Sequence, residues 1–78
     1  MTGHIRRVIL ATIRGRTVAL RPAPNGSALT AAEIRTLCTT AAIEPRTTVR
    51  ATFIGLSELP DLEALAESRH IVVQRRRA

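Results

Sequence analysis

Residues 5–20, IRRVILATIRGRTVAL, decide the fold because they predict a β-hairpin with one apolar face and one mixed face. The first arm is rich in β-branched residues, and Gly15 can adopt the positive φ of a tight turn. A turn at Arg14-Gly15 sets Ala11 opposite Val18. Alternation along the strands then places one apolar set together: Ile5, Ile9, Ala11, Val18 and Leu20. Because Arg-Gly is a weaker turn signal than Asn-Gly, a bulged loop is the alternative.

The most sharply marked element is a helix over residues 30–43. Thr30 and Glu33 form a capping-box pattern, in which each side chain accepts a hydrogen bond from the backbone of the other. Leu29 and Ile34 stand at the positions of a hydrophobic staple. The apolar residues at helical spacing on one face are Ile34, Leu37, Cys38 and Ala41. Pro45 drives the residue before it out of the helical region, so the helix is expected to end by about Ile43.

The remaining segments predict a linker, two strands and a second helix. Residues 21–27, RPAPNGS, hold two prolines and an Asn-Gly turn signal, which predicts a linker. Residues 47–54, TTVRATFI, alternate like a half-buried strand whose inward side chains are Val49, Ala51 and Phe53. Residues 57–68 predict a helix with Ser57 as its cap and this apolar stripe: Leu59, Leu62, Leu65 and Ala66. Residues 70–75, HIVVQR, predict the last strand.

These elements predict one α+β domain spanning residues 1–78. The order is ββαβαβ, and the expected architecture is a two-layer sandwich in which one mixed four-stranded sheet carries both helices on one face. The helical segment between the last two strands is long enough for a crossover, which would make those strands parallel or near neighbours.

Charge is unevenly distributed along the chain. Twelve arginines, no lysine and six acids give a net charge of +6. Residues 1–32 hold five arginines and no acid, residues 58–67 hold four acids, and residues 69–78 hold four arginines. This distribution predicts an acidic helical side and a basic open sheet face, which suits an anionic partner. A GC-rich genome also favours arginine over lysine, but it does not explain the excess of arginine over acid.

The sequence predicts no enzyme, no cofactor and no metal site. No serine stands with a histidine and an acid in a nucleophile motif, and RGR and PNGS are single-glycine turns rather than a phosphate loop. His4, His70 and Cys38 are three potential metal ligands, but Cys38 falls on the apolar helix stripe, where a small buried hydrophobe is expected. Glu63 and Glu67 are expected to be solvated helix surface.

The sequence argues against a protein that reads or stacks nucleic-acid bases. Single-strand recognition on a sheet normally uses aromatic platforms, and Phe53, the only aromatic residue, is predicted to lie in the core. A helix that reads the major groove needs Arg, Asn or Gln along an exposed face. The first helix offers mainly threonines and the second is acidic. Phosphate contacts remain, and they would be weak and salt-dependent.

The first functional hypothesis is a non-enzymatic basic binding protein that occupies an acidic or nucleic-acid-handling surface of a partner protein. Val8 and Leu10 among the arginines resemble an apolar interface centre with a basic rim. The chain also resembles phage-encoded inhibitors of host defence, such as anti-CRISPR proteins, in being a small, arginine-rich domain without catalytic motifs, but it shares no sequence motif with them. The alternative is sequence-independent DNA or RNA binding by the same residues. The predicted binding residues are Arg6, Arg7, Arg14, Arg16, Arg50, Arg75, Arg76 and Arg77.

Two expectations concern assembly and compartment. The apolar last strand has nothing after it but arginines, so it is a candidate edge for a homodimer. Cys38 is the only cysteine, so no intrachain disulfide can form. The N-terminus lacks the apolar run of a secretion signal, and no stretch approaches the ~18 apolar residues of a membrane span. We therefore expect a cytoplasmic protein that makes no membrane contact.

Overall fold

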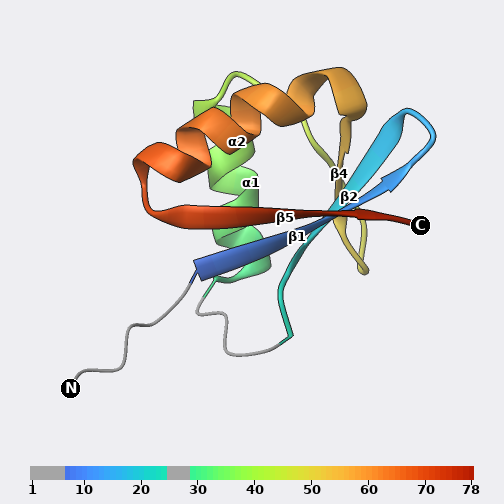
Figure 1. Cartoon of the computed structure of the whole chain (residues 1–78), viewed down its shortest axis with the longest axis horizontal. Helices are drawn as coiled ribbons and strands as arrows, with labels where there is room; N and C mark the ends of the chain where they lie inside the picture. Colours follow the sequence, from blue (N-terminus) through green and yellow to red (C-terminus); the bar gives the residue numbers. More distant parts are fainter. Residues whose placement is uncertain (1–6, 25–28) are drawn as a thin grey trace.

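The computed structural model describes residues 7–24 and 29–78, in which a mixed β-sheet carries two α-helices (Figure 1). Within these residues the sheet has five strands in the order β3-β4-β2-β1-β5. This confirms the α+β class, the mixed sheet and the two helices. The prediction of four strands is wrong, because a two-residue strand precedes the expected third strand and changes the order to ββαββαβ.

β1 (Arg7–Arg14) and β2 (Thr17–Pro22) form the predicted hairpin. Gly15, with φ 61°, is the first of the two turn residues, which is the pattern of a type II′ turn. The predicted turn is therefore one residue too early. Ala11 pairs with Leu20 rather than with Val18, and this two-residue shift keeps every side chain on its predicted face. The buried residues on that face are Ile9, Ala11, Val18 and Leu20. Ile5 and residues 25–27 of the predicted linker lie outside the described residues.

α1 (Ala31–Thr40) begins with the predicted capping box. The Glu33 backbone N–H donates to Thr30 Oγ1 over 3.2 Å, and the Thr30 N–H donates to Glu33 Oε1 over 3.1 Å. Two otherwise unpaired donors at the helix start are thus satisfied by the segment itself. The predicted apolar stripe is confirmed, since Ile34, Leu37 and Cys38 are buried.

α1 ends about three residues earlier than predicted, because the chain turns sharply at Ala42. This residue has φ 60°, in the left-handed region that favours glycine. Its N–H donates to the Thr39 carbonyl over 3.0 Å, and the Ile43 N–H donates to the Cys38 carbonyl over 2.8 Å. This pair of bonds is a Schellman motif, which satisfies the last carbonyls of the helix.

The single strand predicted after α1 is wrong, because the segment folds into a small hairpin. β3 (Arg46–Thr47) and β4 (Thr52–Gly55) pair antiparallel around a turn that Thr48 organises. The Thr48 N–H donates to the Ala51 carbonyl over 2.9 Å, and Thr48 Oγ1 accepts the N–H groups of Arg50 and Ala51, each over 3.2 Å. Such side-chain bonds give the backbone an alternative to a continuing strand.

The inward side chains of β4 are Thr52 and Ile54 rather than the predicted set of Val49, Ala51 and Phe53. Pairing with β2 sets Thr52 beside Leu20 and Ile54 beside Val18, both on the buried face. Thr52 is 2% exposed and Ile54 is 3% exposed, whereas Val49, in the turn, is fully exposed. Phe53 is therefore directed to the opposite face, where it is half-buried.

A short 3₁₀ turn, η1 (Leu56–Glu58), leads into α2 (Leu59–Ser68) and then β5 (Ile71–Arg77). Ser57 is not the helix cap that the sequence predicts; instead the Glu58 carboxylate accepts the Gly55 N–H over 2.9 Å. The predicted stripe of α2 is confirmed by the burial of Leu59, Leu62 and Ala66.

β5 includes the arginine triplet and pairs parallel with β1 (Figure 1). β4 and β5 run in the same direction, but β2 and β1 separate them, so the expected parallel relation holds and the expected adjacency does not.

The core lies between the helices and one face of the sheet. A single cluster joins buried residues of both helices to inward residues of β1, β2, β4 and β5. Both helices therefore pack on the same face, and no described helix covers the opposite face, which we call the open face. Neither described helix combines the length and apolarity needed to cross a lipid bilayer.

Candidate binding groove on the open sheet face

One row of side chains crosses the open face over all five described strands. The strand register aligns, from β3 to β5, Arg46, Phe53, Ala19, Thr12 and Arg76. An arginine ends the row at each edge of the sheet. Since neighbouring strands lie about 4.8 Å apart, the backbones at the two ends are separated by roughly 19 Å. The small side chains of Ala19 and Thr12 in the middle of the row leave space, and longer side chains around them enclose it.

That space is a groove of about 290 Å³. Its lining residues are Thr12, Arg14, Thr17, Ala19, Arg21, Arg50, Ala51 and Phe53. Arg14 and Arg21 each lie two residues along a strand from the central row, on opposite sides of it, at about 7 Å. Arg50 enters from the turn between β3 and β4. None of the eight lining residues is acidic, so the groove has walls of positive charge and a small-residue floor.

The guanidinium groups of the open face have no counterion within the described residues. Arg14, Arg21, Arg50 and Arg76 are all exposed, and none makes an ion pair with another described residue. Arg46, the fifth arginine of this face, is also exposed and unpaired, but it lines a hollow with Glu44 and Glu58, so these four form the groove set. Guanidinium groups present planar forks of donors that match carboxylate and phosphate oxygens. Several of them around one concave surface raise the local positive potential and attract anions.

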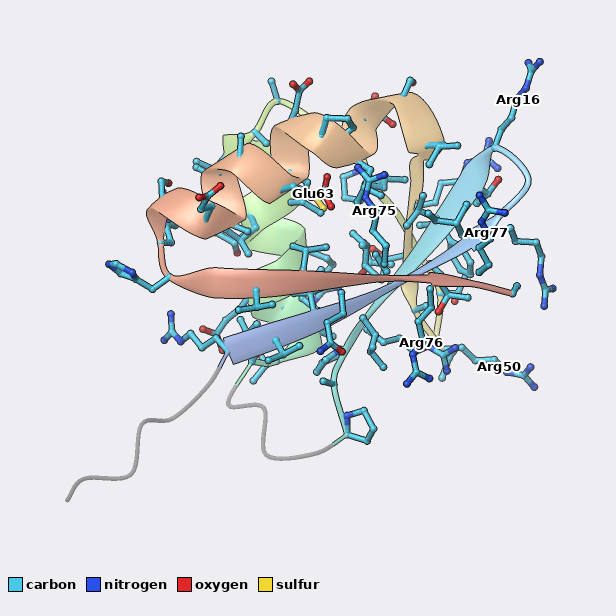
Figure 2. All side chains as sticks on the ribbon, viewed as in Figure 1. Arg16, Arg50, Glu63, Arg75, Arg76 and Arg77 are labelled. Atoms are coloured by element: carbon cyan, nitrogen blue, oxygen red, sulfur yellow. The ribbon has the colours of Figure 1, made fainter. Side chains whose placement is uncertain are left out.

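The arginine triplet is divided between the two faces, because consecutive residues of a strand point to opposite sides. Arg76 shares the open face with Thr12, its partner in β1. Arg75 instead lies on the helix side, where its Nε and Nη2 donate to the Glu63 carboxylate over 2.8 and 2.6 Å. Figure 2 shows Arg75 directed toward Glu63, and Arg76 and Arg50 directed away from the helices. Arg77 is aligned with Ile13, which packs against the core side.

The Glu63–Arg75 pair is a structural link between α2 and β5. The Arg75 guanidinium holds the pKa of the Glu63 carboxyl below its usual value, chiefly through these hydrogen bonds. The same bonds raise the pKa of Arg75. Arg75 is therefore committed to an intramolecular partner and adds no unpaired charge to the groove.

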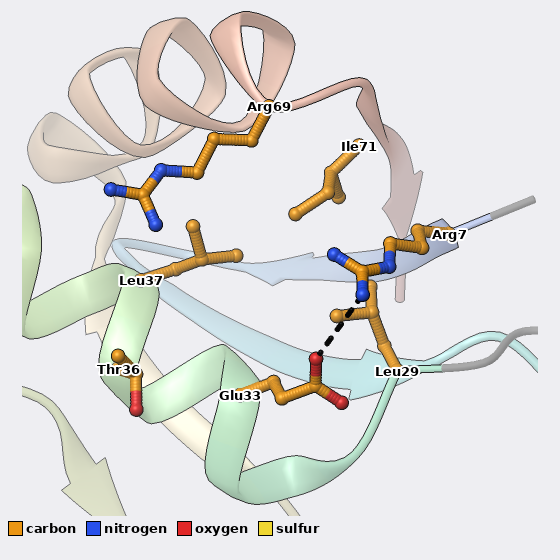
Figure 3. A pocket seen from close by; sticks show the side chains of 7 residues that line it. All are labelled: Arg7, Leu29, Glu33, Thr36, Leu37, Arg69 and Ile71. Carbon is orange, nitrogen blue, oxygen red and sulfur yellow. Dashed lines mark ion pairs between the residues drawn. The ribbon is translucent and has the colours of Figure 1, made fainter.

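A second hollow, of about 150 Å³, lies on the helix side between α1 and the starts of β1 and β5. Figure 3 shows Arg7 and Arg69 on its two sides and an ion pair between Arg7 and Glu33, at 3.7 Å. The carboxylate of this pair offsets the charge of Arg7, so the hollow is less suited to anions than the groove.

The predicted binding residues are therefore not one surface. Arg14 and Arg50 line the groove, and Arg76 lies on the same face. Arg7 and Arg75 are ion-paired on the helix side. Arg16 stands at the exposed hairpin tip, clear of the groove (Figure 2). Arg77 shares the helix side, and Arg6 lies outside the described residues.

Phe53 and Arg21 line the groove but are missing from the predicted binding residues. The hairpin alternation already places Arg21 on the open face. Alternation counted from Val49 predicts Phe53 in the core, but this count crosses the turn organised by Thr48. Counting from Ile54, the larger β-branched residue, directs Phe53 outward. The prediction that this ring is in the core is wrong, so one aromatic face is accessible for base stacking. The sequence has no Tyr or Trp, so a platform of several rings remains excluded.

The described residues do not form a metal site. No three His, Cys, Asp or Glu side chains among them gather closely enough to hold an ion. Cys38 is fully buried in the core, and burial raises the pKa of its thiol to about 11, so it remains protonated at neutral pH.

No family model, no curated protein and no solved structure matches this chain.

Proposed function

We propose that this chain is a non-enzymatic domain that binds nucleic acid through phosphate contacts on the open sheet face. The observation that carries the proposal is the set of four exposed arginines, Arg14, Arg21, Arg50 and Arg76, around a groove with no acidic lining residue. A polyanion with regularly repeated phosphates can meet several of these guanidinium groups at once. Each contact releases a condensed counterion, which is the main source of sequence-independent affinity.

The division of charge between the two faces supports the same proposal. Four of the six acids lie in or beside α2, which packs on the helix side. A polyanion approaching the groove therefore meets arginines, and the sheet lies between it and Asp61, Glu63 and Glu67. Glu58 is nearer, since it lines a neighbouring hollow with Glu44, Arg46 and Phe53. Such segregation orients the molecule during encounter and favours one binding face.

A second candidate is a partner protein with an acidic or nucleic-acid-handling surface, as for an inhibitor. It is favoured by Val72, which is 51% exposed on the open face beside Val8. An apolar patch next to arginines is typical of protein interfaces. It ranks second because the concave part of the face is the basic groove.

The test is fluorescence anisotropy with the nuclease-treated protein and labelled oligonucleotides of about 12 nucleotides, within the usual site size of small sheet domains. The variant R14Q/R50Q removes two charges from the groove. Its control, R35Q/R69Q, removes two charges from exposed residues of the helical layer and has the same net charge.

We expect the parent protein and R35Q/R69Q to bind, and R14Q/R50Q to lose most of its affinity. Equal losses in both variants would show that net charge alone drives binding, which contradicts an open-face site. If nucleic acid is not bound at low ionic strength but poly-L-glutamate is, the acidic-protein candidate replaces the proposal.

A further inference from the structure

The position of Phe53 identifies the form of nucleic acid that fits the groove. The ring belongs to the central row of the open face, with Ala19 beside it on β2 and Ala51 two residues earlier in the chain. Both neighbours are small, and the ring is only half-buried although it is the one aromatic group in the chain. An apolar ring left accessible at the wall of a charged groove is suited to a flat, apolar ligand surface.

We infer that the groove holds single-stranded nucleic acid, with one unpaired base stacked on Phe53 and the flanking phosphates on the arginines; this inference rests on the proposed function. In a duplex the faces of the bases are covered by their neighbours in the stack, so a side chain on a sheet cannot reach them without unstacking. A single strand offers those faces freely, and every base has one, so stacking is largely independent of sequence.

The size of the groove agrees with one base rather than a helix. At about 290 Å³ it lies just below the range of pockets that enclose drug-sized molecules, roughly 300–1,000 Å³. A planar base is a ligand of that scale. The Thr12 and Thr17 side chains on the floor are neutral donors and acceptors, which impose no charge on the base.

The arginines lie where the flanking phosphates would run. Arg14 and Arg21 stand to either side of the central row, and Arg50 stands at the Phe53 end of the groove. Arg76 lies on the same row, three strands from Phe53, at a backbone separation of about 14 Å. A strand laid across the sheet along this row thus passes the aromatic ring, runs between Arg21 and Arg14 on its two sides, and reaches Arg76.

The experiment measures anisotropy with a single-stranded oligonucleotide and the matching duplex, for the parent protein, F53L and F53W. Leucine keeps an apolar side chain but removes the aromatic face, and tryptophan enlarges that face. We expect tighter binding of the single strand than of the duplex. F53L should weaken single-strand binding about 5- to 150-fold, the usual cost of losing one stacked base, with little change for the duplex. Its salt slope should not change, because no charge is lost.

F53W supplies a second readout, since it introduces the only tryptophan of the chain. We expect its fluorescence to be quenched by the single strand and not by inorganic polyphosphate, which has phosphates but no bases. Circular dichroism establishes that each variant is folded.

If F53L binds the single strand like the parent, or tryptophan fluorescence is unchanged at saturation, the inference fails. The proposed function then still stands on phosphate contacts alone. Absence of binding to both nucleic acids overturns the two together.

Discussion

Replacing Ala42 with glycine should stabilise the protein, because this position has a backbone conformation that alanine adopts at a cost. Ala42 follows α1 with φ 60° and is exposed, so the substitution removes no buried contact. A left-handed conformation costs a residue with a Cβ about 1–2 kcal/mol, and glycine adopts it freely. Glycine also gives the unfolded chain more freedom, which costs about 0.4–1 kcal/mol. The difference predicts a gain of about 0.5–1 kcal/mol.

The gain should be visible as a change in melting temperature. In a domain of this size, 1 kcal/mol shifts Tm by roughly 4–8 °C, so A42G should melt about 2–8 °C higher than the parent, measured by circular dichroism. Urea unfolding should give a higher midpoint with an unchanged m-value, because the surface exposed on unfolding is the same.

The matched control is A64G, the same chemical change in the middle of α2. Ala64 is exposed and lies in a regular helical turn, where glycine costs about 1 kcal/mol relative to alanine. One substitution should therefore raise Tm and the other lower it. An unchanged or lower Tm for A42G would refute the argument that α1 ends in a strained left-handed residue.

Three further perturbations test the core, the α2–β5 link and the hairpin. Burial raises the pKa of Cys38 to about 11 from an ordinary value of 9.0, so the native thiol should resist Ellman's reagent near pH 8 until urea is added. For the same reason the free energy of unfolding should fall as pH rises from about 9 toward 11. Rapid reaction of the native protein would contradict this. Since Arg75 lowers the pKa of Glu63, the pair stabilises the fold above the unfolded-state pKa, and that contribution is lost as pH falls through the lowered value. E63Q should accordingly melt below the parent at neutral pH and approach it in acid, and a difference independent of pH would speak against the pair. Gly15 has φ 61°, and no atom lies near the position of an added Cβ. G15A should therefore lower the free energy of unfolding in urea by about 1 kcal/mol through backbone strain alone. An unchanged free energy would exclude the positive φ.

The sequence predicts those parts of the fold whose signals are local. The capping box of Thr30 and Glu33 and the apolar stripes of both helices are complete within one turn or one helix. The faces of the first hairpin were also predicted correctly although the turn was misplaced by one residue. A two-residue shift in pairing returns each side chain to the same side of a strand, so the burial of Ile9 and Leu20 is insensitive to that error.

The parts that could not be predicted depend on pairing between distant strands. The segment around β4 alternates acceptably in two phases, with either Phe53 or Ile54 inward, and only the pairing of Ile54 with Val18 decides between them. The turn at Thr48 interrupts the count. The prediction takes the phase with Phe53 inward, whereas the structure has the other phase and places this ring, the only aromatic group of the chain, at the groove.

The candidate site shows the same limit. The composition of the strands predicts a basic open face. Arg14, Arg50 and Arg76 do lie on it. The sequence predicts a binding role for all three arginines of the triplet, but consecutive residues of β5 point to opposite faces. Arg75 therefore pairs with Glu63, and Arg76 lies on the open face. Which arginine meets an acid depends on where α2 packs, and no local pattern in the sequence contains that information.

The most direct test of the central claim is the salt dependence of oligonucleotide binding. If four open-face arginines neutralise phosphates of a single strand, log Kobs should fall against log[salt] with a slope of about −2.8, which is roughly a 50-fold loss of affinity between about 50 and 200 mM salt. R14Q/R50Q should reduce the slope to about −1.4, and R35Q/R69Q should leave it near −2.8. A slope near zero for the parent, or the same reduction in both double variants, would contradict a phosphate-binding site on the open sheet face.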